Sequence, residues 1–303
     1  MRAFSSMPVA ERLADSIKAK ARAKGERPDR AMVRYVQERV AFRLAETFPG
    51  LVVKGSFAEV ARNPPGARFA PDLDLWLPER PEDMDLLLED VFSLTYYDER
   101  GAIEDGIDVT EVRWQETHAH LEEPGMKFRL TVNVGKVRVP LKVDFAFGLG
   151  HADGYETAVL PSMVPSFGEI WLPVQPAARA VAEKLHAMAE FGAANTRVKD
   201  VWDLRAHLVR DGVNVDAVAV EIAKVFAARG RDVDPGLACL TREWAEANEA
   251  AWTRWHVEAG LPLERSLTDA VDAIRPPARA ALLAAARTLD AVPEAVPLPA
   301  PAA

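Results

Sequence analysis

The sequence has one cysteine, no long apolar run and no excess of positive charge, and each absence excludes a class of protein. With Cys239 as the only thiol, the chain can form neither an intrachain disulfide nor a cysteine-rich zinc site. No apolar run approaches the roughly 18 residues of a membrane span, and the first 20 residues lack the apolar centre of a signal peptide. A net charge of −9 disfavours indiscriminate nucleic-acid binding. We therefore expect a cytoplasmic protein that has no membrane partner.

What the sequence does contain is enough apolar residues for a substantial core, together with an uneven distribution of charge. Its 303 residues are 49% hydrophobic, which suits one large domain or two ordinary ones. Residues 1–54 carry twelve Lys and Arg against six Asp and Glu, whereas residues 79–123 hold fifteen acids and three arginines. The acidic segment would suit a cationic ligand, and the basic segment is a candidate phosphate track, although both could equally be solvated faces. The candidate track comprises Lys18, Lys20, Arg22, Lys24, Arg27 and Arg30.

Hydrophobic periodicity divides the chain into an α+β half and a helical half. In the first half we expect helices over residues 30–48 and 81–94, a short strand over 109–114 and a hairpin over 128–147 that turns at Gly135-Lys136. A proline-punctuated connection over residues 161–176 leads to a region that is helical in pattern. The predicted organisation is therefore an α+β core with N-terminal helices (1–170), a helical domain (171–292) and a disordered Pro/Ala-rich tail (293–303).

The stretch around which the chain is organised is DLDLWL, residues 72–77. In a strand successive side chains alternate between faces, so Asp72, Asp74 and Trp76 project to one side, while Leu73, Leu75 and Leu77 project into the core. Two adjacent carboxylates repel each other unless a cation neutralises them, and Mg²⁺ usually takes one or two carboxylates plus substrate phosphates. The alternative interpretation is a pair of solvated aspartates on an edge strand.

Gly55-Ser56 lies upstream of this pair, between an apolar run and a predicted helical turn. Glycine allows close approach of the backbone to a phosphate, and amides with a hydroxyl at a strand-to-helix turn form an anion site. The order strand, Gly-Ser, helix, turn and D-x-D strand resembles the DNA polymerase β-like nucleotidyltransferase superfamily. Members of that superfamily carry a third carboxylate on a later, neighbouring strand, and Asp144 is the matching residue here.

The helical half contributes a second group of polar residues. A predicted helix over residues 179–191 carries Lys184 and His186, and a second over 197–204, with Asn195 and Thr196 as candidate N-caps, carries Asp200 and Asp203. The spacing of Lys199 and Asp203 permits an intrahelical ion pair. Since no second His or Cys stands at the next turn, His186 is interpreted as a partly buried histidine and not as a metal ligand. Likewise Trp252 and Trp255 are interpreted as core anchors in preference to a base-stacking platform.

Taken together, KGSFAEV, DLDLW, LKVDFAFG and AEKLHAMAEFGAANTRVKDVWDL closely resemble the AbiEii/AbiGii-type nucleotidyltransferase family, over roughly residues 30–210. The resemblance implies a polymerase β-like nucleotidyltransferase mixed sheet with flanking helices, followed by a helical C-terminal half. It also assigns roles to individual residues. Gly55 and Ser56 match the phosphate-binding turn; Asp72, Asp74 and Asp144 match the catalytic metal ligands; Lys184 matches a lysine that faces the nucleotide phosphates; and Asp200 matches a catalytic aspartate.

The function expected from this resemblance is Mg²⁺-dependent transfer of nucleotides from a nucleoside triphosphate to an RNA acceptor. In the MenT-like branch that acceptor is the tRNA 3′ end, and many members are toxins that act beside a small antitoxin protein. Two alternatives stay open. The acceptor could be a small molecule, as in aminoglycoside nucleotidyltransferases, or the chain could be a catalytically idle binding protein of the same fold.

Overall fold

The computed structural model describes residues 8–62, 67–84, 88, 97–98, 101–102, 104–117, 125–148 and 154–290. The chain divides into two compact units, Met1–Gln175 and Pro176–Ala303, each with its own hydrophobic core. The division falls five residues after the predicted boundary, because the strand that ends at Val174 pairs with the first unit's sheet. The predicted tail (293–303) and most of the predicted helix over 81–94 lie outside the described residues.

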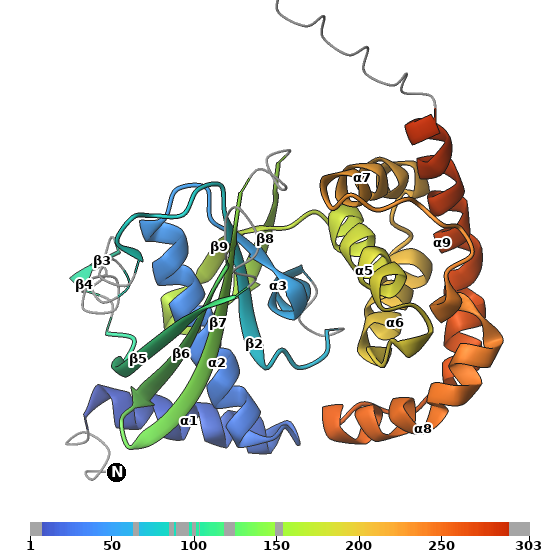
Figure 1. Cartoon of the computed structure of the whole chain (residues 1–303). Helices are drawn as coiled ribbons and strands as arrows, with labels where there is room; N and C mark the ends of the chain where they lie inside the picture. The colour runs from blue at the N-terminus through green and yellow to red at the C-terminus, as the bar shows by residue number, and fades with distance from the viewer. Residues whose placement is uncertain are drawn as a thin grey trace, which may run out of the picture. The chain divides into compact units, whose positions relative to one another are not determined.

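The first unit is built on a mixed seven-stranded sheet (Figure 1). Its strands, in spatial order, are β5 (Ile107–Thr117), β6 (Gly125–Val134), β7 (Val137–Phe147), β2 (Asp72–Leu77), β1 (Val52–Lys54), β9 (Glu169–Val174) and β8 (Glu156–Pro161). β2 runs parallel to β7 and antiparallel to β1, which is itself parallel to β9. A separate two-stranded ladder joins β3 (Tyr97–Asp98) to β4 (Gly101–Ala102).

The described residues of this unit form the helices α1 (Val9–Ala23), α2 (Pro28–Thr47) and α3 (Gly55–Arg62), with a short 3₁₀ helix η2 (Pro165–Phe167) before β9. The predicted helix over 30–48 and the hairpin over 128–147 are confirmed as α2 and as β6 with β7. The predicted connection over 161–176 is wrong, because β9 and η2 lie within it and β8 ends at its first residue. Edge strand β8 was not predicted at all.

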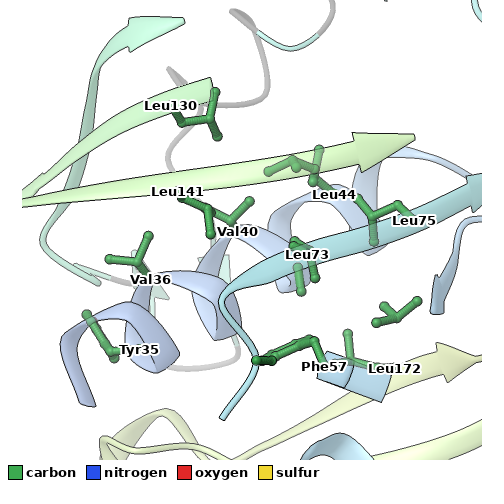
Figure 2. Close-up of a cluster of buried hydrophobic side chains, with 14 of the residues drawn as sticks. Tyr35, Val36, Val40, Leu44, Phe57, Leu73, Leu75, Leu130, Leu141 and Leu172 are labelled. Carbon is green, nitrogen blue, oxygen red and sulfur yellow. The ribbon is translucent and has the colours of Figure 1, made fainter. Parts of the chain in front are cut away.

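α2 covers one face of the sheet with an apolar surface (Figure 2). Val36, Val40 and Leu44 of this helix face Leu73 and Leu75 of β2, and all five side chains are at most 1% exposed. Fully burying each such aliphatic side chain contributes roughly 1.5–3 kcal/mol, so this contact is a main source of the unit's stability. It also fixes the orientation of β2, because a one-residue slip would place the aspartates in the core.

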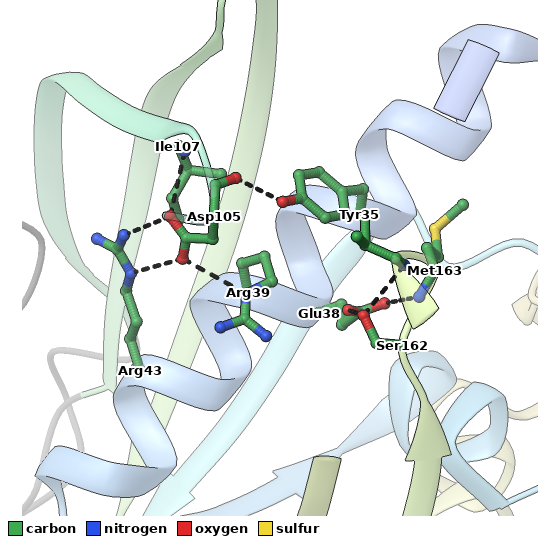
Figure 3. A network of polar contacts seen from close by, with 9 residues as sticks. Tyr35, Glu38, Arg39, Arg43, Asp105, Ile107, Ser162 and Met163 are labelled. Carbon is green, nitrogen blue, oxygen red and sulfur yellow. Dashed lines mark hydrogen bonds and ion pairs between the residues drawn. The ribbon is translucent and has the colours of Figure 1, made fainter. Parts of the chain in front are cut away.

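A buried polar network connects α2 to two segments that are distant in sequence (Figure 3). Asp105 accepts hydrogen bonds from Arg39 and Arg43, and its backbone carbonyl accepts one from the Tyr35 hydroxyl. Between Tyr35 and Arg39 on the same helix, the Glu38 carboxylate accepts hydrogen bonds from the Ser162 hydroxyl and from the backbone amide of Met163. Burial raises the pKa of Glu38. The network thus holds the segments before β5 and after β8 against one helix.

α1 lies against α2 and not against the polar face of the sheet. Its buried residues, Ala14, Ile17 and Ala21, join the core formed with α2, and its N-terminal turns contact the end of the β-sheet near Gly106 and Gly135. The basic residues of the predicted phosphate track therefore belong to the helical layer.

The described residues of the second unit form helices joined by loops, without strands. It contains α5 (Ala177–Phe191), η3 (Gly192–Ala194), α6 (Val198–Arg205), the π-helical turn η4 (Ala206–Arg210), α7 (Val215–Ala228), η5 (Ala238–Leu240), α8 (Arg242–Ala259) and α9 (Leu267–Asp290). α9 continues through Pro276 and Pro277, where a sequence pattern would end a helix. Trp252 is 2% exposed and packs with Trp202, Trp255 and His256, which confirms the interpretation of this tryptophan pair as core.

Candidate active site

The polar face of the sheet follows from alternation over residues 72–75 of β2; Trp76, which shares the face of the aspartates, is itself buried. Leu73, Leu75 and Leu77 are at most 3% exposed in the core, whereas Asp72 and Asp74 are half-buried on the opposite face, as predicted. The amide nitrogen of Gln37, a buried residue of α2, donates to the backbone carbonyls of residues 70 and 72 over 3.0 Å each. This side chain therefore fixes the backbone at the point where the aspartate pair begins.

The third predicted carboxylate lies beside this pair. β7 is hydrogen-bonded to β2 in parallel, and Asp144 stands in register with Asp74. The Lys127 ammonium of β6 lies 3.1 Å from Asp144 Oδ2, while Asp144 Oδ1 is buried without a hydrogen-bond partner among the described residues. The prediction that these strands are neighbours is confirmed. Asp144 thus has one oxygen held by a cation and one oxygen whose hydrogen-bonding capacity is unused.

The Gly55-Ser56 turn lies against the same carboxylates. Gly55 begins α3 directly after β1, with φ at +60°, and a Cβ at this position would lie 2.0 Å from Asp74 Oδ2. Only glycine allows the aspartate to occupy its observed place, since any side chain would overlap it. Ser56 is 5% exposed. The glycine is therefore required by the close approach of a carboxylate to the backbone, and α3 begins at this contact.

The donor set fits a divalent metal ion of the hard type. Asp74 and Asp144 are neighbours on adjacent strands, and Asp72 lies two residues before Asp74 on the same face. Asp144 Oδ1 is a buried acceptor without a hydrogen-bond partner among the described residues. Within the described ranges, no three His, Cys, Asp or Glu side chains gather into a preassembled metal cluster. Mg²⁺ does not require one, because it usually combines one or two carboxylates with water and substrate phosphates.

The helical unit holds the other predicted site residues in a cluster of its own. Lys184 Nζ of α5 lies 2.9 Å from Asp203 Oδ2 and 3.6 Å from Asp200 Oδ1 of α6, and Arg197 Nε lies 2.7 Å from Asp200 Oδ2. Both aspartate side chains are at most 3% exposed. Asp203 thus pairs with Lys184 across two helices, whereas the sequence suggested Lys199 within one helix.

The same unit tests two further predictions, the N-cap of α6 and the role of His186. The proposed side-chain N-cap of α6 is wrong, because the helix begins at Val198 and Asn195 instead accepts a hydrogen bond from the Arg197 amide. His186 is buried against Phe226, and its Nδ1 lies 3.0 Å from an Arg229 nitrogen. Burial, followed by the nearby guanidinium, lowers the pKa of His186. This environment matches the interpretation of His186 as a core histidine.

Sequence reasoning missed two contributors to the site, Gln37 and Lys127. Gln37 lies in a helix whose pattern gives no sign of a buried amide, and Lys127 precedes the run that marked β6. For Lys127 a signal existed, since extending the alternation of β6 backwards by one residue places it on the same face as Asp144 once the hairpin is paired.

A comparison of the chain with models of protein families identifies the family to which it belongs. The family model described as "Nucleotidyl transferase AbiEii toxin, Type IV TA system" matches residues 39–288, which span most of both units and include every predicted site residue. This chain belongs to the AbiEii family. It is therefore a nucleotidyltransferase of the toxin class of type IV toxin–antitoxin systems. Membership of this class implies a nucleoside triphosphate substrate and an antitoxin partner. Enzymes of this chemistry generally use a divalent metal ion.

Solved structures similar to this AbiEii-family chain are distant in sequence. JHP933 from Helicobacter pylori is 15% identical, with 84% of this chain and 93% of that chain covered and a TM-score of 0.46. MenT4, a nucleotidyltransferase toxin from Mycobacterium tuberculosis H37Rv, is 19% identical, with 89% and 100% covered and a TM-score of 0.46. No curated protein sequence matches the chain. Among the described residues of this AbiEii-family chain, no helix is long and apolar enough to cross a membrane.

Proposed function

We propose that this protein transfers nucleotides from a nucleoside triphosphate to the 3′ hydroxyl of an RNA, with tRNA as the acceptor and Mg²⁺ as the metal. The observation that carries the proposal is the juxtaposition of Asp74 and Asp144 on adjacent strands, with Gly55 against Asp74. Asp72, Asp74 and Asp144 would hold Mg²⁺, which when bound supplies charge neutralisation to the triphosphate and to the attacking hydroxyl.

The protein's own groups supply orientation and charge. The turn at Gly55 and Ser56 presents the first amides of α3 to the distal phosphates, as helix N-termini do for anions. Lys184 contributes positive charge to the nucleotide phosphates, and Asp200, only 1% exposed, positions Lys184 through their 3.6 Å ion pair. The roles of Lys184 and Asp200 rest on the family resemblance of their two helices.

The decisive experiment incubates the protein with each labelled nucleoside triphosphate, total cellular RNA and Mg²⁺, and then sizes the labelled product. We expect labelled RNA of tRNA length, and we expect Asp74→Asn to abolish it while leaving circular dichroism and melting unchanged or improved, because neutralising one of two adjacent carboxylates removes repulsion. Label that appears in a small molecule, or full activity of Asp74→Asn at saturating Mg²⁺, would overturn the proposal.

A further inference from the structure

The polar face of the sheet carries two parallel rows of polar, mostly charged residues that cross its strands. Register pairs define the first row as Gln115 of β5, Lys127 of β6, Asp144 of β7 and Asp74 of β2. The second row lies two residues along each strand and consists of Arg113, Arg129, Lys142 and Asp72. Because residues two apart in a strand share a face, both rows lie on the carboxylate side of the sheet.

The second row is unusual because three cations stand side by side in it. Arg113 is directly opposite Arg129, and Arg129 is directly opposite Lys142. Like charges that face each other across strands destabilise a sheet. Arg113 is ion-paired with Glu111, but Arg129 and Lys142 are exposed and have no ion pair with any described residue. The two contacts between like charges therefore give the sheet no stabilisation of their own.

Arg113, Arg129 and Lys142, here called the cationic row, form a line that leads to the active site. Neighbouring strands are about 4.8 Å apart, so the row extends about 10 Å from the edge strand β5 to β7. The next strand in the same row carries Asp72, and Lys142 is separated from Asp144 by a single residue. A chain of negative charges laid along the row would therefore end at the carboxylates.

We infer that Arg113, Arg129 and Lys142 bind the sugar-phosphate backbone of the RNA acceptor strand and direct its 3′ end to Asp74 and Asp144. The inference rests on the proposed function and names the surface that recognises its acceptor. Three exposed cations in a line, two of which have no ion pair with a described residue, suit a flexible polyanion, whose phosphates relieve their mutual repulsion. The basic residues of α1 are less suited, because α1 lies against α2, which covers the opposite face of the sheet.

The test measures the affinity of a short 5′-fluorescein-labelled single-stranded RNA by anisotropy, at 50 and 200 mM salt, without nucleotide. The variant is Arg113→Gln/Arg129→Gln/Lys142→Gln, and the matched control is Lys20→Gln/Arg22→Gln/Lys24→Gln at the C-terminal end of α1, which removes the same charge. Each phosphate contact on a single strand contributes about 0.7 to the slope of log affinity against log salt, so losing three flattens it by about 2. Over a fourfold rise in salt the wild-type protein should thus lose about 20-fold more affinity than the cationic-row variant.

We expect the control variant to behave like the wild-type protein and the melting temperature of the cationic-row variant to be unchanged or higher, since opposed charges are removed. Equal weakening in both triple variants would show that binding follows net charge and would overturn the inference, as would an unchanged slope in the cationic-row variant. A raised KM for the nucleoside triphosphate with unchanged RNA affinity would assign the row to the other substrate and also overturn it. RNA binding is measured without nucleotide and does not depend on transfer, so a failure of this inference can be distinguished from a failure of the proposed transfer activity.

Discussion

Removing the carboxylate of Asp105 tests whether the buried network on α2 supports the first unit. Asp105, Arg39 and Arg43 have side chains that are 2–6% exposed, and the Arg43 Nη2 to Asp105 Oδ1 distance is 2.8 Å. Asp105→Ala would leave two buried guanidinium groups without their anion and the Ile107 amide without its acceptor. Breaking a buried ion pair from one side costs about 3–5 kcal/mol. For a unit of this size we expect the melting temperature to fall by roughly 6–20 °C.

The assay is urea unfolding followed by circular dichroism, with Asp108→Ala as the matched control. Asp108 is an exposed aspartate on β5, three residues further along, and its substitution should change the unfolding free energy by no more than about 0.5 kcal/mol. The triple variant Arg39→Met/Arg43→Leu/Asp105→Leu removes all three charges and should recover most of the loss. A cost below about 1 kcal/mol for Asp105→Ala would refute the reasoning, because the arginines would then have found water or another anion.

Three further perturbations probe the site and the helical unit. Gly55→Ala should lower transfer about a hundredfold by displacing Asp74, whereas Gly25→Ala, with similar positive φ but open space around it, should leave activity intact; equal activity of the two variants would contradict the contact. Lys184→Met should also lower transfer about a hundredfold, and a melting curve measured alongside separates this effect from loss of helix packing. Burial lowers the pKa of His256, so unfolded chains bind more protons and the helical unit should lose stability as pH falls below about 6.5. Urea titrations at several pH values should show that the unfolding free energy of His256→Phe depends less on pH than that of the wild-type protein. An equal pH dependence in the two proteins would exclude this histidine as the cause.

Much of the carboxylate face could be predicted because local alternation determines it. The two-residue period of DLDLW places Asp72 and Asp74 on one face, and the same period in LKVDF places Asp144. Their juxtaposition also needed the pairing of β2 with β7, which lies about seventy residues away and which only the family resemblance suggested. The position of Gly55 against Asp74 depends on this tertiary pairing too, although its sequence signal was visible.

What could not be predicted depends on contacts between distant segments. β9 contains Pro173 and follows other prolines, so its sequence favours a connection, yet it pairs in parallel with β1 and is buried at three positions. Lys184 meets Asp203 only because α5 and α6 pack together, whereas spacing within one helix favoured Lys199. In the same way α9 passes through two prolines because the core of the helical unit buries it on both sides of them.

The location of β2 at the centre of a seven-stranded sheet has a consequence for how such an enzyme can be switched off. β2 pairs along its whole length with β7 and, over residues 74–76, also with β1, so Asp72 and Asp74 stand on a segment that opens only when the surrounding sheet opens. Local fraying of strand ends therefore does not displace the two aspartates from the site. Silencing by unfolding would cost nearly the full stability of the first unit, so covering the polar face or competing for its substrates is the energetically cheaper form of control.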